Sequence, residues 1–121
     1  MARILLTDDE AGTRDLVRRA LEADGHGVVV MDSGTEALAR LALEPHGFEL
    51  VVTDVNMPGL DGLELAQHAQ ALNPGLAIVL MSGLVEQLER AKALKAHNYF
   101  TIAKPFTLEQ MRALVRTALS T

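Results

Sequence analysis

The sequence contains no cysteine and no tryptophan, and it has only one tyrosine and three phenylalanines. The absence of cysteine excludes a disulfide framework and a thiolate metal site. So few aromatic rings, together with a net charge of −5, disfavour a nucleic acid as a direct partner. No apolar run is long enough to cross a bilayer, and Asp8 and Asp9 interrupt the first one before a signal-peptide core could form. We therefore expect a cytoplasmic protein with no membrane insertion and no direct nucleic-acid contact.

Apolar residues, by contrast, make up 49% of the 121 positions, which suits one domain with one packed interior. We expect this domain to span residues 1–121, with no output domain after it. Along it, short apolar runs of strand length alternate with segments in which apolar residues recur at helical spacing. The expected strands lie at 4–6, 28–31, 50–54, 77–81 and 99–103, and the expected helices at about 13–24, 34–44, 63–72, 84–94 and 108–118.

The strand-like runs are apolar on both faces, so helices must cover both faces, as they do in parallel sheets. Right-handed crossovers then give a doubly wound α/β sandwich, for which this class of fold implies the flavodoxin-like strand order 2-1-3-4-5. Gly25 stands where a helix C-cap belongs, and Ser33–Glu36 and Thr107–Gln110 have capping-box spacing. The predicted core-facing helix positions include Leu16, Leu84, Leu94 and Leu108.

The stretch from Leu50 to Gly62 organises the rest of the chain. A buried strand ends there on Asp54 and gives way to a loop that contains Asn56, a proline and two glycines. In open α/β sheets, ligands bind at the carboxyl ends of the strands. The first, fourth and fifth strands end on Asp8 and Asp9, on Ser82 and on Lys104, respectively. Three carboxylates, one hydroxyl and one ammonium are therefore expected to meet at one edge of the sheet.

Clustered carboxylates repel one another, and a hard divalent cation relieves the repulsion. We expect Asp9 and Asp54 to bind Mg²⁺ directly, and Asp8 to bind it directly or through water. The backbone carbonyl of Asn56 would complete the ligands that the protein supplies. Mn²⁺ is the alternative ion, because it also prefers carboxylate, carbonyl and water oxygens.

Phosphate chemistry explains the remaining polar residues at this edge. Lys104 supplies a point positive charge, and Ser82 supplies a hydroxyl donor for oxygens of a group attached to Asp54. Backbone N–H groups at Gly83 and around Asn56 could add further donors. A carboxylate beside Mg²⁺ and a lysine can attack a phosphoryl donor, which makes Asp54 the expected phosphoacceptor.

These residues resemble the receiver domain of bacterial response regulators over essentially the whole chain. The resemblance rests on four segments, which are Asp8-Asp9, Asp54 with 56–62, 81–83 and 104–106. It implies that Asp54 accepts phosphate from a phosphohistidine on a sensor histidine kinase or a histidine phosphotransfer protein, and that a downstream protein is the target. It also implies that the Ser82 hydroxyl moves towards the phosphate and that the Lys104–Pro105 peptide is cis. Such a domain is a phosphoacceptor rather than an enzyme with a separate substrate.

One position departs from that family. Receivers commonly place tyrosine or phenylalanine three residues before the lysine, where its ring follows the hydroxyl, and Thr101 stands there instead. Tyr99 and Phe100 are close in sequence, but strand alternation sends them to opposite faces. The usual switch is thus reduced to Ser82 and Thr101. The dimer that receivers commonly form through the face of the fifth strand is therefore not favoured here, and we expect a monomer or a weak dimer.

A second resemblance is to the single-domain receivers of alphaproteobacteria that, when unphosphorylated, prime a Clp-type AAA+ protease. This resemblance rests on residues 61–66, on residues 81–83 followed by 86–91, and on the non-aromatic fifth strand. It implies a stand-alone receiver and a Clp-type protease as the downstream partner.

Two other functions use similar parts. A phosphatase of the haloacid-dehalogenase type also has an aspartate nucleophile and Mg²⁺, but it places a second aspartate two residues later, where this chain has Asn56. A flavodoxin-like cofactor binder would need a phosphate loop where the acidic run from Asp8 to Glu10 would repel phosphate.

Each candidate residue also has an ordinary structural explanation. Asp8 and Asp9 suit a helix N-terminus, Asp54 can simply end a strand, Ser82 can cap a helix and Lys104 can be a solvated charge. It would be a coincidence if all of these ordinary explanations applied together at four strand ends. The four histidines have no metal-ligand spacing and receive no chemical role; they are His26, His46, His68 and His97.

Overall fold

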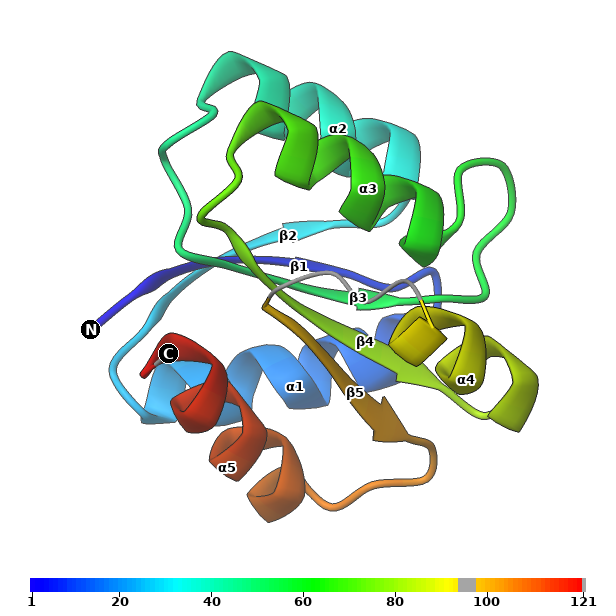
Figure 1. Ribbon diagram of the computed structural model, residues 1–121. Helices are drawn as coiled ribbons and strands as arrows, with labels where there is room; N and C mark the ends of the chain where they lie inside the picture. The colour runs from blue at the N-terminus through cyan, green and yellow to red at the C-terminus, as the bar shows by residue number, and fades with distance from the viewer. Residues whose placement is uncertain (94–97, 121) are drawn as a thin grey trace.

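The computed structural model describes residues 1–93 and 98–120 and shows a five-stranded sheet between two layers of helices (Figure 1). Leu94, predicted to continue a helix, and His97 lie outside the described residues. The strands are β1 (Arg3–Thr7), β2 (Gly27–Met31), β3 (Leu50–Asp54), β4 (Ala77–Ser82) and β5 (Tyr99–Ala103). The helices are α1 (Ala11–Ala23), α2 (Gly34–Leu43), α3 (Gly62–Leu72), α4 (Val85–Ala93) and α5 (Leu108–Leu119).

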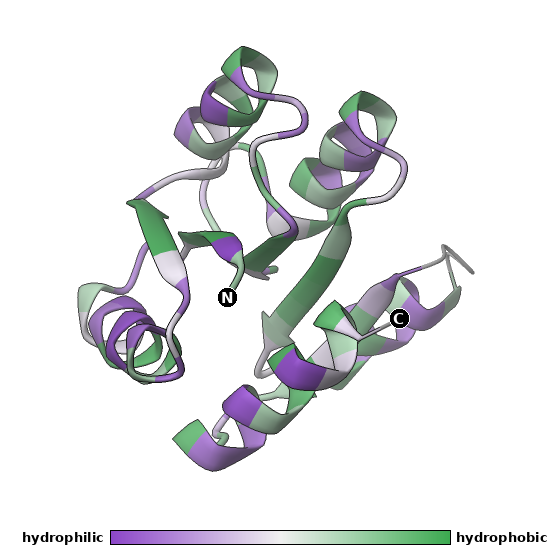
Figure 2. Cartoon of the chain, turned by 90° about the vertical axis from the view of Figure 1, so that its left-hand side faces the viewer, coloured by the Kyte–Doolittle hydropathy of each residue, from purple (hydrophilic) through white to green (hydrophobic). Residues whose placement is uncertain are grey.

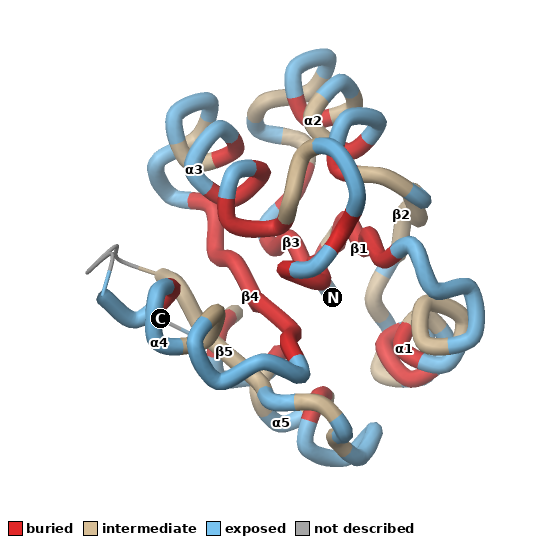
Figure 3. Tube along the Cα trace, turned by 90° about the vertical axis from the view of Figure 1, so that its right-hand side faces the viewer, coloured by how far each residue is buried: buried red, intermediate tan, exposed pale blue. Residues whose placement is uncertain are grey.

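The sheet is parallel, and its strand order is β2-β1-β3-β4-β5. This confirms the predicted doubly wound fold and its order. The order places β1, β3 and β4 in the middle, so their carboxyl ends are neighbours. Figure 3 looks onto this carboxyl edge and shows the three central strands as the most deeply buried part of the chain.

Alternate strand residues face two separate cores. Leu5, Val51 and Ile78 are register partners on the face covered by α2, α3 and α4. The residues on the other side, such as Leu6 and Val52, pack under α1 and α5. Hydrophobic colour accordingly dominates the central strands in Figure 2, whereas the helices carry both colours. Burial of each such leucine contributes about 2 kcal/mol, so both helix layers are held firmly to the sheet.

Side-chain caps fix where the helices begin, and hence where the loops at the carboxyl edge end. Thr107 and Gln110 form the predicted capping box of α5. The hydroxyl of Ser33 accepts the Glu36 amide at the start of α2, also as predicted. Asp61 forms a further capping box with Glu64 at α3, which the sequence analysis overlooked. Gly25 has a φ of +91° just after the C-cap of α1, a conformation that favours glycine.

Three predicted core positions are wrong. Leu16 is 52% exposed, Leu84 is 48% exposed and Leu108 is 38% exposed. Leu16 on α1 and Leu108 on α5 line a groove with Phe106, where the two helices face each other beyond the sheet. Leu84 precedes α4 instead of lying on its inner side. Helical periodicity gives the inward direction of a residue but does not show where the opposing element ends.

Within the described residues, no helix is both long enough and apolar enough to cross a bilayer.

Candidate functional site

The predicted site residues meet at the carboxyl edge of the sheet. Asp54 is the last residue of β3 and Ser82 the last residue of β4, and both side chains are buried. Asp8 follows β1 directly and has no exposed surface, whereas the next residue, Asp9, is exposed. Lys104 follows β5 directly, and its backbone N–H donates to the Ser82 carbonyl at 2.8 Å. Four strand ends thus supply one cluster, as the sequence indicated.

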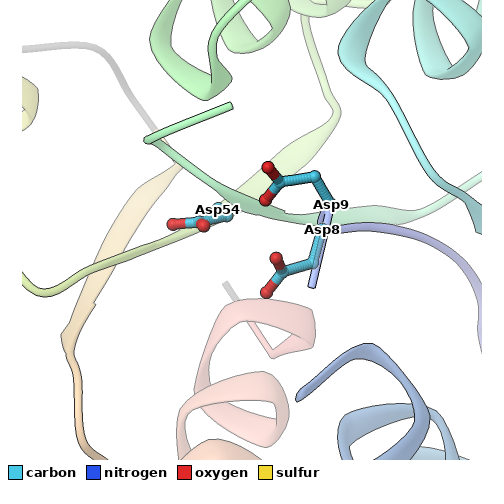
Figure 4. A group of neighbouring side chains, drawn as sticks. All are labelled: Asp8, Asp9 and Asp54. Carbon is cyan, nitrogen blue, oxygen red and sulfur yellow. The ribbon is translucent and has the colours of Figure 1, made fainter. Parts of the chain in front are cut away.

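The three aspartates form a compact group of carboxylates. One oxygen from each of Asp8, Asp9 and Asp54 lies within 4.8 Å of the others. Figure 4 shows the side chains of Asp8 and Asp9 leaving the end of β1 towards the side occupied by Asp54. Oxygen ligands at such mutual distances suit a hard divalent cation. The arrangement therefore fits the predicted Mg²⁺ site.

Lys104 lies between the two buried carboxylates. Its Nζ is 3.2 Å from Asp54 Oδ2 and 3.4 Å from Asp8 Oδ2. Burial alone would lower the pKa of Lys104, but attraction to Asp8 and Asp54 outweighs burial, and the pKa is raised above its ordinary value. The ammonium is therefore charged at neutral pH and aimed at the oxygens of Asp54.

The surroundings of Asp8 disfavour the charged form of its carboxyl group. Burial raises the pKa of its carboxyl, and the nearby Asp54 raises it further. The Glu10 amide at 2.9 Å and the Lys104 ammonium act in the opposite direction without cancelling the effect of burial. Three carboxylates thus gather here, and the Lys104 ammonium pairs with two of them, Asp8 and Asp54. A divalent cation would relieve that imbalance, which is a second reason why the residues fit Mg²⁺.

The loop after Asp54 is held tightly against the strand end. Asp54 Oδ1 lies 3.4 Å from the Asn56 amide, and Gly62 N–H donates to the Val55 carbonyl at 2.9 Å. A Cβ on Gly62 would lie 2.2 Å from the Asp54 carbonyl oxygen, so only glycine fits there. Asn56 is exposed at the rim, while the neighbouring Met57 is buried. The loop thus fixes the backbone on both sides of the predicted carbonyl ligand.

Ser82 is in the predicted place, but its hydroxyl is engaged with other groups. Its Oγ lies 2.6 Å from Gln87 Oε1 and accepts the Leu84 amide at 3.0 Å. Because α4 begins at Val85, Ser82 is not its N-cap, and that alternative is excluded. Gly83 is exposed beside Lys104, with space around it. Sequence reasoning missed Gln87, because a glutamine on an outward-looking helix turn carries no distinguishing signal.

The fifth strand agrees with the predicted departure. Tyr99 packs in the core under α2, α3 and α4, and Phe100 packs in the core under α1 and α5. Thr101 is partly buried and pairs in register with Leu80 of β4. The Lys104–Pro105 peptide is cis, as the resemblance implied.

Comparisons with known proteins agree with this geometry. The family model described as the response regulator receiver domain matches residues 4–116. A receiver domain protein from Clostridium thermocellum is 26% identical with a TM-score of 0.89, and the match covers 99% of this chain and 95% of that one. A CheY-like receiver domain protein from Methanospirillum hungatei is 27% identical with a TM-score of 0.88, covering 99% and 94%.

The receiver domain of NtrX from Brucella abortus is 32% identical, with a TM-score of 0.85 and 98% coverage of both chains. Among curated proteins no match was found. None of these similarities bears on the Clp-type partner, which stays a prediction. The family match extends over nearly the whole chain and includes every strand end at the site. The chain therefore belongs to the response regulator receiver domain family of two-component signalling.

Proposed function

We propose that this receiver domain accepts a phosphoryl group from a phosphohistidine onto Asp54 and thereby changes its contacts with other proteins. The observation that carries the proposal is the placement of the Lys104 ammonium 3.2 Å from Asp54 Oδ2, beside the carboxylates of Asp8 and Asp9. A single carboxylate thus has a cation and a group of metal-binding oxygens within reach.

In the proposed reaction, a carboxylate oxygen of Asp54 attacks the phosphorus atom of the phosphohistidine. A P–O bond forms, the P–N bond breaks, and the electron pair of that bond returns to the imidazole nitrogen. With the other ring nitrogen of the phosphohistidine already protonated, the leaving group is a neutral imidazole. The product is an acyl phosphate on Asp54. Attack by water later releases inorganic phosphate and restores the carboxylate. The domain therefore modifies only itself, and it is a signalling module rather than an enzyme with its own substrate.

The chain's residues act mainly by position and charge. Lys104 holds its ammonium beside the position that the oxygens of the transferred group would occupy. The buried strand end fixes the direction of the Asp54 carboxylate. Ser82 and the backbone amide of Gly83 would donate to the remaining phosphoryl oxygens. Asp8, Asp9 and Asp54, with the Asn56 carbonyl, would hold Mg²⁺ or Mn²⁺. When bound, the ion neutralises negative charge on the carboxylates and on the phosphoryl group.

The phosphodonor of this proposal is a sensor histidine kinase or a histidine phosphotransfer protein, and the downstream target is a protein. A small acyl phosphate can replace the natural donor in a test, because the chain supplies the groups that stabilise the transfer. The protein is incubated with acetyl phosphate and Mg²⁺, and the modified residue is located by mass spectrometry.

The test variant is Asp54→Asn, which keeps the shape of the side chain and removes the nucleophile. We expect labelling of the wild type at Asp54, no labelling of the variant, and no labelling of the wild type after chelation of the metal. Asp24→Asn is the matched control, because Asp24 follows α1 at the opposite, amino end of the sheet. Undiminished labelling of Asp54→Asn would show that another residue accepts the group and would overturn the proposal.

A further inference from the structure

The hydroxyl of Ser82 is tied to the first turn of α4. Its Oγ lies 2.6 Å from the Oε1 atom of Gln87, the third residue of that helix. The same Oγ accepts the backbone N–H of Leu84 at 3.0 Å. Ser82 is completely buried and Gln87 is partly buried, so little water competes for these bonds. The first turn of α4 is thereby bonded to the end of β4 through a side chain.

A serine hydroxyl has one hydrogen to donate and two lone pairs that accept. One lone pair of Ser82 receives the Leu84 amide, and the hydrogen is donated to Gln87 Oε1 at 2.6 Å, since the other acceptor, the Leu84 carbonyl, is farther away at 3.4 Å. The same hydrogen cannot be given to an oxygen of a group on Asp54. We propose that Gln87 is a positioning residue that competes with the phosphoryl group for the Ser82 proton. This inference rests on the proposed function and extends it to the regulation of the same site.

The strand geometry shows what the exchange requires. Met81 is the register partner of Asp54, and its carbonyl accepts the Val55 amide at 2.9 Å. The side chain of Met81 lies in the core under α1 and α5. Ser82 is the next residue, so alternation along β4 directs its side chain to the face that α4 covers. Its hydroxyl must turn from this face towards Asp54 to reach a phosphoryl oxygen, and the bond to Gln87 breaks when it does.

The charge of the acceptor decides the direction of the exchange. An amide oxygen is neutral, whereas a phosphoryl oxygen is charged, and hydrogen bonds to charged acceptors are about twice as strong. The proton therefore stays with Gln87 in the unmodified protein and passes to the phosphoryl group after transfer. Loss of the bond frees the start of α4, where Leu84 is 48% and Val85 is 67% exposed. The chemical event is thus transmitted to α4 through Gln87.

The test measures how tightly the protein binds fluoroberyllate with Mg²⁺, which mimics the phosphoryl group on a carboxylate. Binding is followed by ¹⁹F NMR of the bound fluoroberyllate. Gln87→Leu removes the competing acceptor and keeps a side chain with a similar helix propensity. A hydrogen bond of ordinary strength corresponds to about 2- to 10-fold, so we expect fluoroberyllate to bind tighter by that factor. Gln87→Glu keeps an acceptor and should bind it no more tightly than the wild type.

Two controls separate this role from a structural one. Glu89→Leu places the same side chain on an exposed position of α4, and its affinity should equal that of the wild type. In a Ser82→Ala background there is no proton to compete for, so adding Gln87→Leu should change the affinity less than about twofold. An equal gain in both backgrounds would mean that Gln87 acts by some other route, and the inference would be wrong.

A measurement on the unaltered protein serves if Gln87→Leu fails to fold. The side-chain amide signal of Gln87 should shift when fluoroberyllate binds, while that of Gln67, exposed on α3, should not. An unchanged Gln87 signal in a protein that binds fluoroberyllate overturns the inference alone. A wild type that neither binds fluoroberyllate nor is labelled at Asp54 overturns the proposed function instead. The two failures are therefore distinguishable.

Discussion

The two ends of the sheet handle charge in opposite ways. At the amino end, the Arg3 guanidinium lies 4.5 Å from the centre of the Phe48 ring and 3.2 Å from Glu44. Arg40 pairs with the same carboxylate at 3.1 Å and also lies over Phe48. One carboxylate there has two guanidinium partners, and both guanidinium groups lie over one aromatic ring. At the carboxyl end, three carboxylates gather, and the Lys104 ammonium pairs with two of them, Asp8 and Asp54.

This difference separates stability from function. Paired charges over an aromatic ring hold the start of β1 and the loop before β3 in place. Each of these charges already has a partner within the protein. Crowded carboxylates cost stability unless something else compensates them, which the proposed metal ion and phosphoryl group would do. The charges at the amino end are paired within the protein, whereas the proposed function gives the carboxyl end a ligand that would balance its charges.

The largest change in stability should come from adding one side-chain carbon beneath the carboxyl end of the sheet, where there is no room for it. In Gly62→Ala, the new Cβ would meet the backbone of Asp54 at 2.2 Å, and backbone cannot move aside cheaply. We expect the free energy of unfolding to fall by about 3 kcal/mol in urea titrations. Gly47→Ala at the amino end meets the flexible Arg3 side chain at 3.0 Å and Glu44 Cβ at 2.8 Å, and should cost about 1 kcal/mol. Equal losses at the two glycines would contradict the tight packing assigned to Gly62.

Metal should stabilise the carboxyl end and leave the amino end unaffected. A ligand that binds only the folded state at 100 times its Kd adds about 2.7 kcal/mol to the free energy of unfolding. We expect a saturable rise of that order when Mg²⁺ is added to the wild type, measured by thermal unfolding. Asp9→Asn should lose most of it, because Asp9 is exposed and its removal leaves the core intact. Glu44→Gln should retain the full rise, and a loss there would indicate a nonspecific ionic effect.

Removing one carboxylate in metal-free buffer tests the crowding itself. Asp8→Asn relieves a buried negative charge whose pKa burial already raises, so we expect a gain of about 1 kcal/mol in unfolding free energy. Glu44→Gln breaks two partly exposed ion pairs, with Arg3 and Arg40, and should lose about 0.5 kcal/mol. Chemical denaturation of both variants at neutral pH measures whether the free energy of unfolding rises or falls in each. A loss in Asp8→Asn would show that its hydrogen bonds outweigh the repulsion.

The carboxyl end was also the part that could be predicted best from the sequence. Strand order and shared strand ends follow from apolar runs and right-handed connections, and these placed Asp54 and Lys104 together. The capping box of Asp61 was equally visible in its spacing, but the residue was interpreted as part of the loop. The bond between Ser82 and Gln87 could not be foreseen, since it depends on a side-chain rotamer and on where α4 begins.

The smallest effect concerns Asp24, which closes α1 and bonds Arg112 of α5 at 3.1 Å through Nε. The Arg112 hydrogen bonds lower the pKa of the Asp24 carboxyl below its ordinary value of 3.8. A pKa lowered by folding means that the pair stabilises the protein above pH 3.8, and that this contribution is lost as the pH falls through the lower folded pKa. Asp24→Asn should therefore melt below the wild type at neutral pH, and the gap in Tm should close on acidification. A gap that persists in acid would mean that the charge of Asp24 does not cause the difference, because the neutral carboxyl group and the amide have nearly the same shape.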